Sequence, residues 1–474
     1  MSMQFDAIRD RIRSAVWILP AALLLLAVAA GVLLPLVDRF VGDSVSKVEM
    51  LTTTPDGAQT ILATIASSAV TVAGVVFSLT MVMFSIASSQ FGTRVLRNRM
   101  RERSTQVAVG TLLGTAVYCL LVLRSVSGVQ GESHVPHLSV MTAILLTLVS
   151  LLVVVFFLRD MTNAIQATHI VASIAGELDA SIDRLFPEKI GYGNAAEEDD
   201  DCWRPDSASR PVASSQQGYI QAIDGDELLS VAQRRDLVIF LRKRPGDFLA
   251  RRMEFAEVWG ANEVDDELAA AINEAIVTGI TRTPWQDVNC SIHELAQVAV
   301  RALSPGINDP FTAMNSIDRL GAALMKLAER KTPSRFRRDA AGRLRLVANP
   351  VTFAEALAAA FNQVRMYAIN SPAVSTRLLE ALENIAGCVH READREAIIS
   401  QARLLAEACD IALSLASEQA QIRGQMQRVV KAFPDAAADD DPAGVGDEGP
   451  TNGDAPDETD QPEDAGVGKG EVNG

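Results

Sequence analysis

Small and hydroxylated side chains recur along one uncharged stretch of the sequence, at steps of three or four residues. This series, called the hydroxyl seam below, consists of Ser67, Thr71, Gly74, Ser78, Met81, Ser85 and Ser88. Residues three and four apart share one face of a helix, so the spacing predicts a helix with a small, mostly polar face. In a membrane, such a face either packs closely against another helix or lines a polar path.

The stretch that carries the seam runs from Gly57 to Thr93 without a charged side chain. Five arginines follow it at once: Arg94, Arg97, Arg99, Arg101 and Arg103. An apolar run that ends in arginines predicts a membrane span with its cytoplasmic end there, where the arginines set topology and contact acidic lipid. The absence of charge within the span argues against an ion-coupled pump, because proton and ion relays need intramembrane carboxylates.

This stretch is longer than a bilayer requires. A helix of its length reaches about 55 Å at about 1.5 Å per residue, whereas the hydrocarbon core is about 30 Å thick. The helix must therefore tilt, break, or project beyond the membrane. Projection would join it to the domain that follows the membrane region.

Three further apolar runs are long enough to cross a bilayer. With the seam helix they predict a membrane domain over residues 1–160, with spans at about 15–37, 61–90, 104–124 and 138–159. Arginines precede the first span and follow the second, so both termini are expected in the cytoplasm of a bacterial inner membrane. A cleavable signal peptide is the competing interpretation of the first run, but the run continues past Ala29 as an uncleaved anchor would.

The rest of the chain predicts a mostly helical cytoplasmic domain. We expect an amphipathic connecting helix over 161–187, a linker over 188–217, a small β-rich module over 218–260, a helical domain over 261–430 and a disordered acidic tail over 431–474. Within the helical domain, apolar periodicity predicts helices over 264–279, 284–303, 352–369, 372–389 and 391–430, with a lone strand or hairpin at Leu344. The fold class is therefore mainly α.

The acidic character of the protein is concentrated in the tail. The formal net charge is −16, but thirteen carboxylates and the single Lys469 lie from Asp435 onward, which leaves about −4 for the remainder. The tail lacks the large apolar residues needed to bury a core, so it predicts disorder. We expect no nucleic-acid partner.

A second polar segment stands out in the helical domain, from Ala302 to Ala313. Its Pro305-Gly306 pair ends one helix, and Pro310 suits the first position of the next. The residues that could do chemistry here are Asn308, Asp309 and Thr312. They either cap the second helix or present oxygens to a cation or a neighbouring subunit.

Signatures of catalysis are missing from the sequence. Phosphate-loop, dinucleotide-binding, zinc-protease and serine-hydrolase motifs are all absent. The five cysteines and five histidines are scattered and form no metal-ligand spacing. We therefore expect no enzymatic activity, no cofactor and no metal.

Two motifs resemble a known family. The run from Ser88 to Asn98, the segment Ala302 to Ala313 and the four-span layout resemble the uncharacterised bacterial predicted membrane protein family catalogued as domain-of-unknown-function family 2254. The resemblance covers roughly Val16 to Ile411. It implies a plasma-membrane protein and supplies no catalytic residue or cofactor.

Two functional hypotheses follow from the sequence. In the first, the chain forms a homo-oligomer whose second spans surround an axis, as a channel-like or transport-related assembly in membrane lipid, regulated by the cytoplasmic domain. In the second, the four spans anchor a scaffold or sensor whose cytoplasmic domain binds a partner protein. The oligomeric state separates them, because a shared pore requires a symmetry axis.

Overall fold

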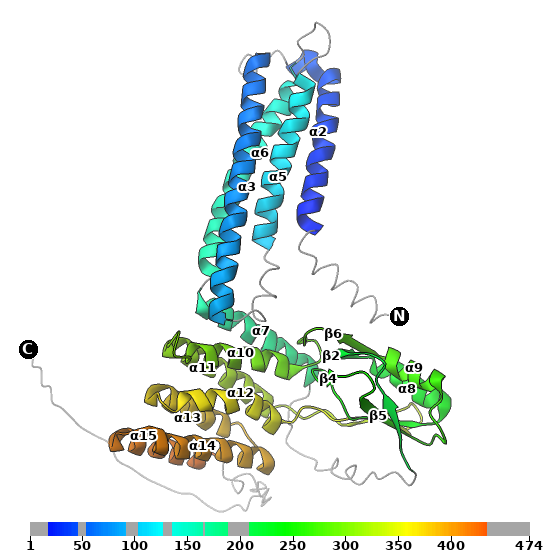
Figure 1. Ribbon diagram of the computed structural model, residues 1–474, viewed down its shortest axis with the longest axis vertical. Coiled ribbons are helices and arrows are strands. Elements are labelled where there is room, and N and C mark those ends of the chain that lie inside the picture. The colour runs from blue at the N-terminus through cyan, green and yellow to red at the C-terminus, as the bar shows by residue number, and fades with distance from the viewer. Residues whose placement is uncertain are drawn as a thin grey trace, which may run out of the picture. The chain divides into compact units, whose positions relative to one another are not determined.

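The computed structural model describes residues 18–45, 54–91, 103–126, 135–164, 166–187 and 208–433. These residues form 13 helices and eight short strands, which confirms the mainly α fold (Figure 1). The acidic tail and the arginines Arg94, Arg97, Arg99 and Arg101 lie outside the described residues. Arg103 is the first residue of a described helix.

Four helices are long and apolar enough to cross a membrane, as the sequence predicts. They are α2 (Ile18–Val45), α3 (Pro55–Phe91), α5 (Arg103–Val126) and α6 (His137–Ala164). Their candidate spans cover Ile18–Asp38, Pro55–Ser89, Ser104–Val126 and His137–Met161. The first, second and fourth expose most of their surface, which in a membrane protein faces lipid or another chain.

Helix α5 is the centre of this bundle and contacts α2, α3 and α6. Gly110 and Gly114 bring it close to α2: a Cβ on Gly110 would lie 2.9 Å from a Leu23 methyl group and 3.0 Å from the Pro20 Cα. The spacing is the small-x-x-x-small pattern that lets membrane helices approach closely. On the α6 side, the Thr115 and Ser150 hydroxyls are 2.9 Å apart and buried.

Helix α3 is unbroken over 37 residues and continues beyond the bundle. Its last turns carry Phe84 and Ala87, which pack with the core of the helical domain described next, and α3 contacts helix α10 of that domain. Of the three alternatives for this long helix, a break is not seen within Pro55–Phe91, and its end joins the helical domain as projection would require. A membrane helix and the helical domain share one hydrophobic core.

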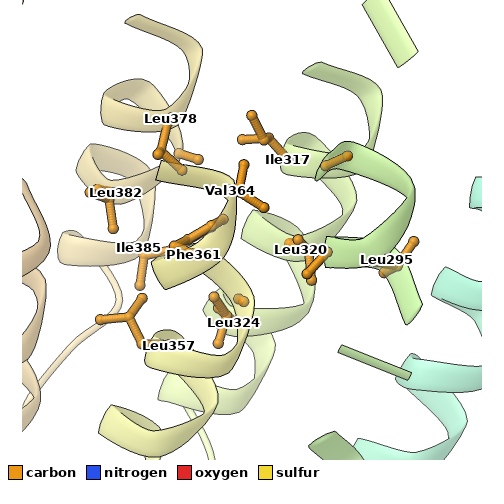
Figure 2. Packing of buried hydrophobic residues seen from close by; sticks show 14 of the residues in the cluster. Leu295, Ile317, Leu320, Leu324, Leu357, Phe361, Val364, Leu378, Leu382 and Ile385 are labelled. Carbon is orange, nitrogen blue, oxygen red and sulfur yellow. The ribbon is translucent and has the colours of Figure 1, made fainter. Parts of the chain in front are cut away.

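The helical domain consists of α7 (Ala167–Leu185), α10 (Val288–Ala302), α11 (Pro310–Ala328), α12 (Phe353–Ala368), α13 (Pro372–Ala386), α14 (Glu392–Ala412) and α15 (Ala416–Lys431). Figure 2 shows how α10 to α13 interlock: Phe361 of α12 lies among Leu320 and Leu324 of α11 and Leu382 and Ile385 of α13, all buried. Burial of each such side chain stabilises the fold by about 1.5–3 kcal/mol.

The expected helix over 391–430 is two helices, so that prediction is wrong. Helix α14 ends at Ala412, where Leu413 adopts an extended conformation, and α15 begins at Ala416. The Gln419 amide donates to the carbonyl oxygens of Asp410 and Leu413, which satisfies acceptors freed by the break. The break lets α15 fold back to contact α13 as well as α14.

A separate β module has its own hydrophobic core. Its strands are β1 (Arg210–Ala213), β2 (Gly218–Ile223), β3 (Val238–Leu241), β4 (Phe248–Leu249), β5 (Glu254–Trp259), β6 (Ile276–Gly279), β7 (Phe336–Arg338) and β8 (Leu344–Ala348). One sheet has the order β1-β5-β3-β8-β7 and the other β4-β2-β6. Helices α8 (Gly225–Arg235) and α9 (Asp266–Glu274) complete the module and contribute Leu228 and Ile272 to its core.

Two strands lie where the sequence predicts other structure, and a third, β8, forms the predicted hairpin. Strand β1 occupies the end of the expected linker, because Val212 is buried and the strand pairs with β5. The expected helix over 264–279 ends at Glu274, and the residues from Ile276 onward pair with β2 instead. Strand β8 is not isolated: it pairs with β7 and, in parallel, with β3.

An ion network fixes β8 to the module. The Arg345 guanidinium is buried and lies 2.6 Å from a carboxylate oxygen of Asp236 and 2.9 Å from one of Asp339. The hydrogen bond from Arg345, with backbone N–H donors from Arg343 and Ala341, lowers the pKa of Asp339 to about 2. This strand therefore depends on an ionised aspartate.

Candidate functional site

The hydroxyl seam lies on the outside of the four-helix bundle. Ser67, Thr71, Gly74, Ser78, Met81 and Ser85 are exposed and Ser88 is partly buried. A Cβ added to Gly74 would meet no atom within 4 Å. The seam is therefore not a packing surface within the chain.

A different face of α3 does that packing. Its buried residues are small or aliphatic: Ala58, Leu62, Ala66, Ala69, Ala73, Val76 and Ala87. At about 100° per residue, this alanine face lies roughly 140° around the helix from the seam. The sequence leaves open whether the seam packs helices or lines a path, and within one chain the alanine face accounts for the packing.

Some hydroxyl groups of the seam bond to the backbone of their own helix. Thr71 Oγ1 donates to the carbonyl oxygen of Ser67 at 2.9 Å, and Ser67 Oγ donates to that of Thr64 at 3.2 Å. A hydroxyl that donates in this way keeps its oxygen lone pairs for other donors or for cations. Within the described residues, the Ser78 and Ser85 hydroxyls have no hydrogen-bond partner.

Met81 is the one large apolar member of the seam, with 46% of its surface exposed. It lies between Ser78 and Ser85, so a path lined by seams from several chains would narrow at this level. Thioether side chains are flexible and apolar, which suits a constriction that opens by rotamer change or by wetting.

The segment from Asn308 to Thr312 is used within its own helix. Asp309 is the N-cap of α11: its carboxylate accepts the Thr312 backbone N–H at 3.1 Å and the Thr312 hydroxyl at 2.6 Å. Asn308 adopts a left-handed conformation with φ of 52°, which turns the chain into the helix. Of the two alternatives for this segment, the contacts describe a cap, and the oxygens of Asp309 are already bonded.

Asp38 is a buried carboxylate whose role the helical periodicity of the sequence does not indicate. It lies in α2, yet its oxygens accept the backbone N–H groups of Leu138 at 3.0 Å and Ser139 at 2.9 Å and the Ser139 hydroxyl at 2.6 Å. The carboxylate therefore caps α6 from another helix. A lone acid directly after an apolar run is the available sequence signal, because such a group must find donors.

The described part of the chain contains no candidate metal-binding site. No group of three or more His, Cys, Asp or Glu side chains is placed there to hold a metal ion. Asp287 is a buried carboxylate that lies 2.7 Å from the Arg282 guanidinium. Burial raises the pKa of Asp287 against the opposing effect of Arg282, so the pair serves the local fold.

Comparison with known proteins places the chain in a family. The model of the predicted membrane protein family DUF2254 matches residues 13–384. The chain belongs to the DUF2254 family of predicted membrane proteins. This confirms the resemblance found in the sequence, with a match that ends before the expected Ile411.

Relatives of the chain occur in mycobacteria. Uncharacterized proteins of Mycobacterium bovis and of Mycobacterium tuberculosis are each 27% identical to it over 430 residues, which cover 90% of this chain and 82% of theirs. No solved structure matches the chain. Membership of this family identifies the chain as a predicted membrane protein. The proposal on function below is based on the geometry of α3.

Proposed function

We propose that this DUF2254 protein assembles as a homo-oligomer through the hydroxyl seam of α3, and that the assembled seams line a passive conduit. The carrying observation is that the seam is exposed while the alanine face of the same helix is buried. Both termini are cytoplasmic in this proposal, which follows from the arginine distribution, and the membrane is a bacterial inner membrane. The proposal includes no enzymatic activity.

Assembly through the seam is favoured because lipid hydrocarbon cannot form hydrogen bonds with the hydroxyl groups of the seam. Ser78 and Ser85 carry hydroxyl groups without a partner within the described residues, and hydrocarbon offers them no hydrogen bond. Gly74 and the serines also let a second backbone approach closely, which favours helix association in membranes. A second copy of α3 supplies both the close contact and the polar neighbours.

The case for a passive path is the chemistry of the seam. It offers hydroxyl oxygens, which can replace part of a hydration shell, and no charged group that a coupled pump would use. Met81 provides the apolar constriction.

Regulation of the conduit by the helical domain is supported by the hydrophobic core that α3 shares with this domain. Phe84 and Ala87, at the end of α3, pack with the helical domain, so a shift of that domain moves the seam helix directly. Packed helices transmit displacements because their interfaces deform little.

The test uses full-length protein in lipid nanodiscs and in liposomes. We expect an oligomer by mass measurement in nanodiscs, and a cation flux in liposomes that Ser78→Leu reduces at least about tenfold, because leucine removes the polar lining and blocks close approach. The matched control is Val75→Leu, at an exposed position on another face of α3, which is expected to leave both readouts unchanged.

A monomer in nanodiscs, or a flux that is equal in wild type and Ser78→Leu, overturns the proposal. A monomer would favour the alternative, a membrane-anchored scaffold or sensor whose extramembrane part binds a partner protein. An oligomer without flux would leave assembly standing and refute the conduit.

A further inference from the structure

A basic pocket lies where the β module meets the helical domain. It has a volume of about 640 Å³, within the range of small-molecule sites. Its lining comes from the end of β3 and the segment after it, from Thr332, Pro333 and Arg335, and from the segment between β8 and α12 with the first turn of α12. Sites for small ligands are common at such junctions between cores.

Four of the lining side chains are cationic: Arg242, Lys243, Arg244 and Arg335. The acidic residues in the lining are Asp247 and Glu355, so the cations outnumber the anions by two. Uncharged donors are present as well, in the Thr332 hydroxyl and the Asn349 amide.

The acids of the pocket are already engaged. Arg244 forms a two-pronged pair with Glu355, at 2.8 and 3.0 Å, and Asp247 accepts the Arg244 backbone N–H at 3.0 Å. Burial opposes ionisation of Glu355, but the hydrogen bonds from Arg244 and Thr352 outweigh it and hold its pKa below the ordinary value. The capping box of Thr352 and Glu355 also closes the start of α12, so the cations are the main attraction for a ligand.

Arg242 is ion-paired with Glu257 and Glu254, which lie outside the lining. Lys243 is the cation that remains. It is partly buried, and among the described residues it has no hydrogen-bond or ion-pair partner. Arg335 is held in place differently: its guanidinium carbon stacks 4.7 Å from the centre of the Phe336 ring. The ammonium group of Lys243 therefore keeps its hydrogen-bond donors and its charge for an anion.

The junction around the pocket is polar on both sides. The two hydrophobic cores are separate, and contacts across the junction include Arg244 with Glu355 and the Gln286 side chain with the backbone of Ile223. Interfaces of this kind adjust more readily than a continuous apolar core. A ligand that contacts both sides would therefore fix their arrangement.

We infer that this pocket binds a small phosphate-bearing ligand, held by Lys243 and Arg335, and that the ligand bridges the β module and the helical domain. Phosphate oxygens match guanidinium and ammonium donors in charge and geometry. The inference stands apart from the proposed conduit, since it uses no residue of α3.

The ligand chemistry has two sources, a soluble phosphorylated compound and the headgroup of an anionic lipid. The test titrates inorganic pyrophosphate into full-length protein in phosphatidylcholine nanodiscs, at constant ionic strength because salt screens such contacts. We expect saturable binding by calorimetry and a raised temperature of unfolding.

Lys243→Ala is the decisive variant, because among the described residues the side chain has no partner whose loss would damage the fold. Removing one charge-assisted hydrogen bond is expected to raise the pyrophosphate Kd by about tenfold. Arg234→Ala, which removes an exposed arginine of α8, is the control and is expected to leave the Kd unchanged. Arg335→Ala is a second variant, with the same expected direction as Lys243→Ala.

Absence of saturable binding, or equal Kd values for Lys243→Ala and wild type, overturns the inference. Repeating the titration in phosphatidylglycerol nanodiscs separates the two sources. If the pyrophosphate Kd of the wild type is the same in both kinds of nanodisc, the natural ligand is a soluble compound. If phosphatidylglycerol raises the pyrophosphate Kd of the wild type but not that of Lys243→Ala, the lipid headgroup competes for the same pocket.

Discussion

The hydroxyl seam of α3 and the segment from Asn308 to Thr312 are similar in sequence and different in structure. Both place small polar side chains at helical spacing, and each admits a structural and a functional interpretation. In the segment, the Asp309 carboxylate bonds to the backbone and hydroxyl of Thr312. In the seam, Ser78 and Ser85 are exposed and have no partner among the described residues.

The difference teaches where polar side chains are available for function. A carboxylate that caps a helix has each oxygen hydrogen-bonded and its geometry fixed by the chain. A row of small side chains on an exposed membrane helix has contacts to gain only from lipid or from another molecule. The comparison predicts that the two regions respond to mutation in opposite ways.

The largest loss of stability is expected from a substitution on the buried alanine face of α3, which serves as the reference for substitutions in the seam. Ala73→Leu adds atoms where Ala73 packs near Ala108, Leu112 and Phe157. Overpacking of this kind costs about 1–3 kcal/mol. Thermal unfolding in detergent should show the loss, and a wild-type melting temperature for Ala73→Leu would refute the assignment of this face.

Loss of the cap comes next. Asp309→Ala removes the acceptor at the start of α11 and is expected to destabilise the protein by about 1 kcal/mol, with no change in oligomeric state. Asp318→Ala, an exposed site on the same helix, is the control and should stay within about 0.5 kcal/mol of wild type. If Asp309→Ala changed assembly but not stability, the segment would be a subunit contact and the comparison would fail.

The seam should show the reverse pattern. Ser78→Leu is expected to shift the free energy of unfolding of the monomer by no more than about 0.5 kcal/mol, because Ser78 is exposed and has no hydrogen-bond partner among the described residues. The same change should shift the protein from oligomer to monomer in nanodiscs. Destabilisation as large as that of Ala73→Leu would show that the seam packs inside the chain.

Acid separates the uncharged seam from a third region, the ion network of the β module. The hydrogen bond from Arg345 is the main cause that lowers the pKa of Asp339 to about 2. The ionised Asp339 carboxylate therefore stabilises the folded protein fully at any pH above the ordinary pKa of an aspartate, and this stabilisation is lost as the pH falls through about 2. The uncharged seam has no such dependence. Unfolding temperatures measured between pH 5 and pH 2 should fall less steeply in Asp339→Asn than in wild type, and equal slopes would contradict this.

Much of the fold is predictable from local patterns. Apolar length predicts the four spans, and periodicity predicts α10, α12 and α13, because these helices bury one face of a regular repeat. The break at Leu413 and the strand at Ile276 are not predictable in this way. Both arise from contacts distant in sequence, with α13 in one case and with β2 in the other.

The candidate site shows the same limit. Sequence spacing identifies the seam, but its exposure depends on which face of α3 meets α5, and that contact is set by the alanines. Asp38 and the pair Gly110 and Gly114 escape the sequence analysis for a related reason. Their roles consist of contacts with other helices, and a single sequence does not indicate the partner.

Cysteine cross-linking in native membranes tests the central claim most directly. The account predicts that Ser78→Cys forms a covalent dimer under mild oxidation and that Val75→Cys, on another face of α3, does not, with the wild-type chain and its five native cysteines as the background control. Cross-linking of Val75→Cys without cross-linking of Ser78→Cys would show that the chains meet elsewhere and would contradict assembly through the hydroxyl seam.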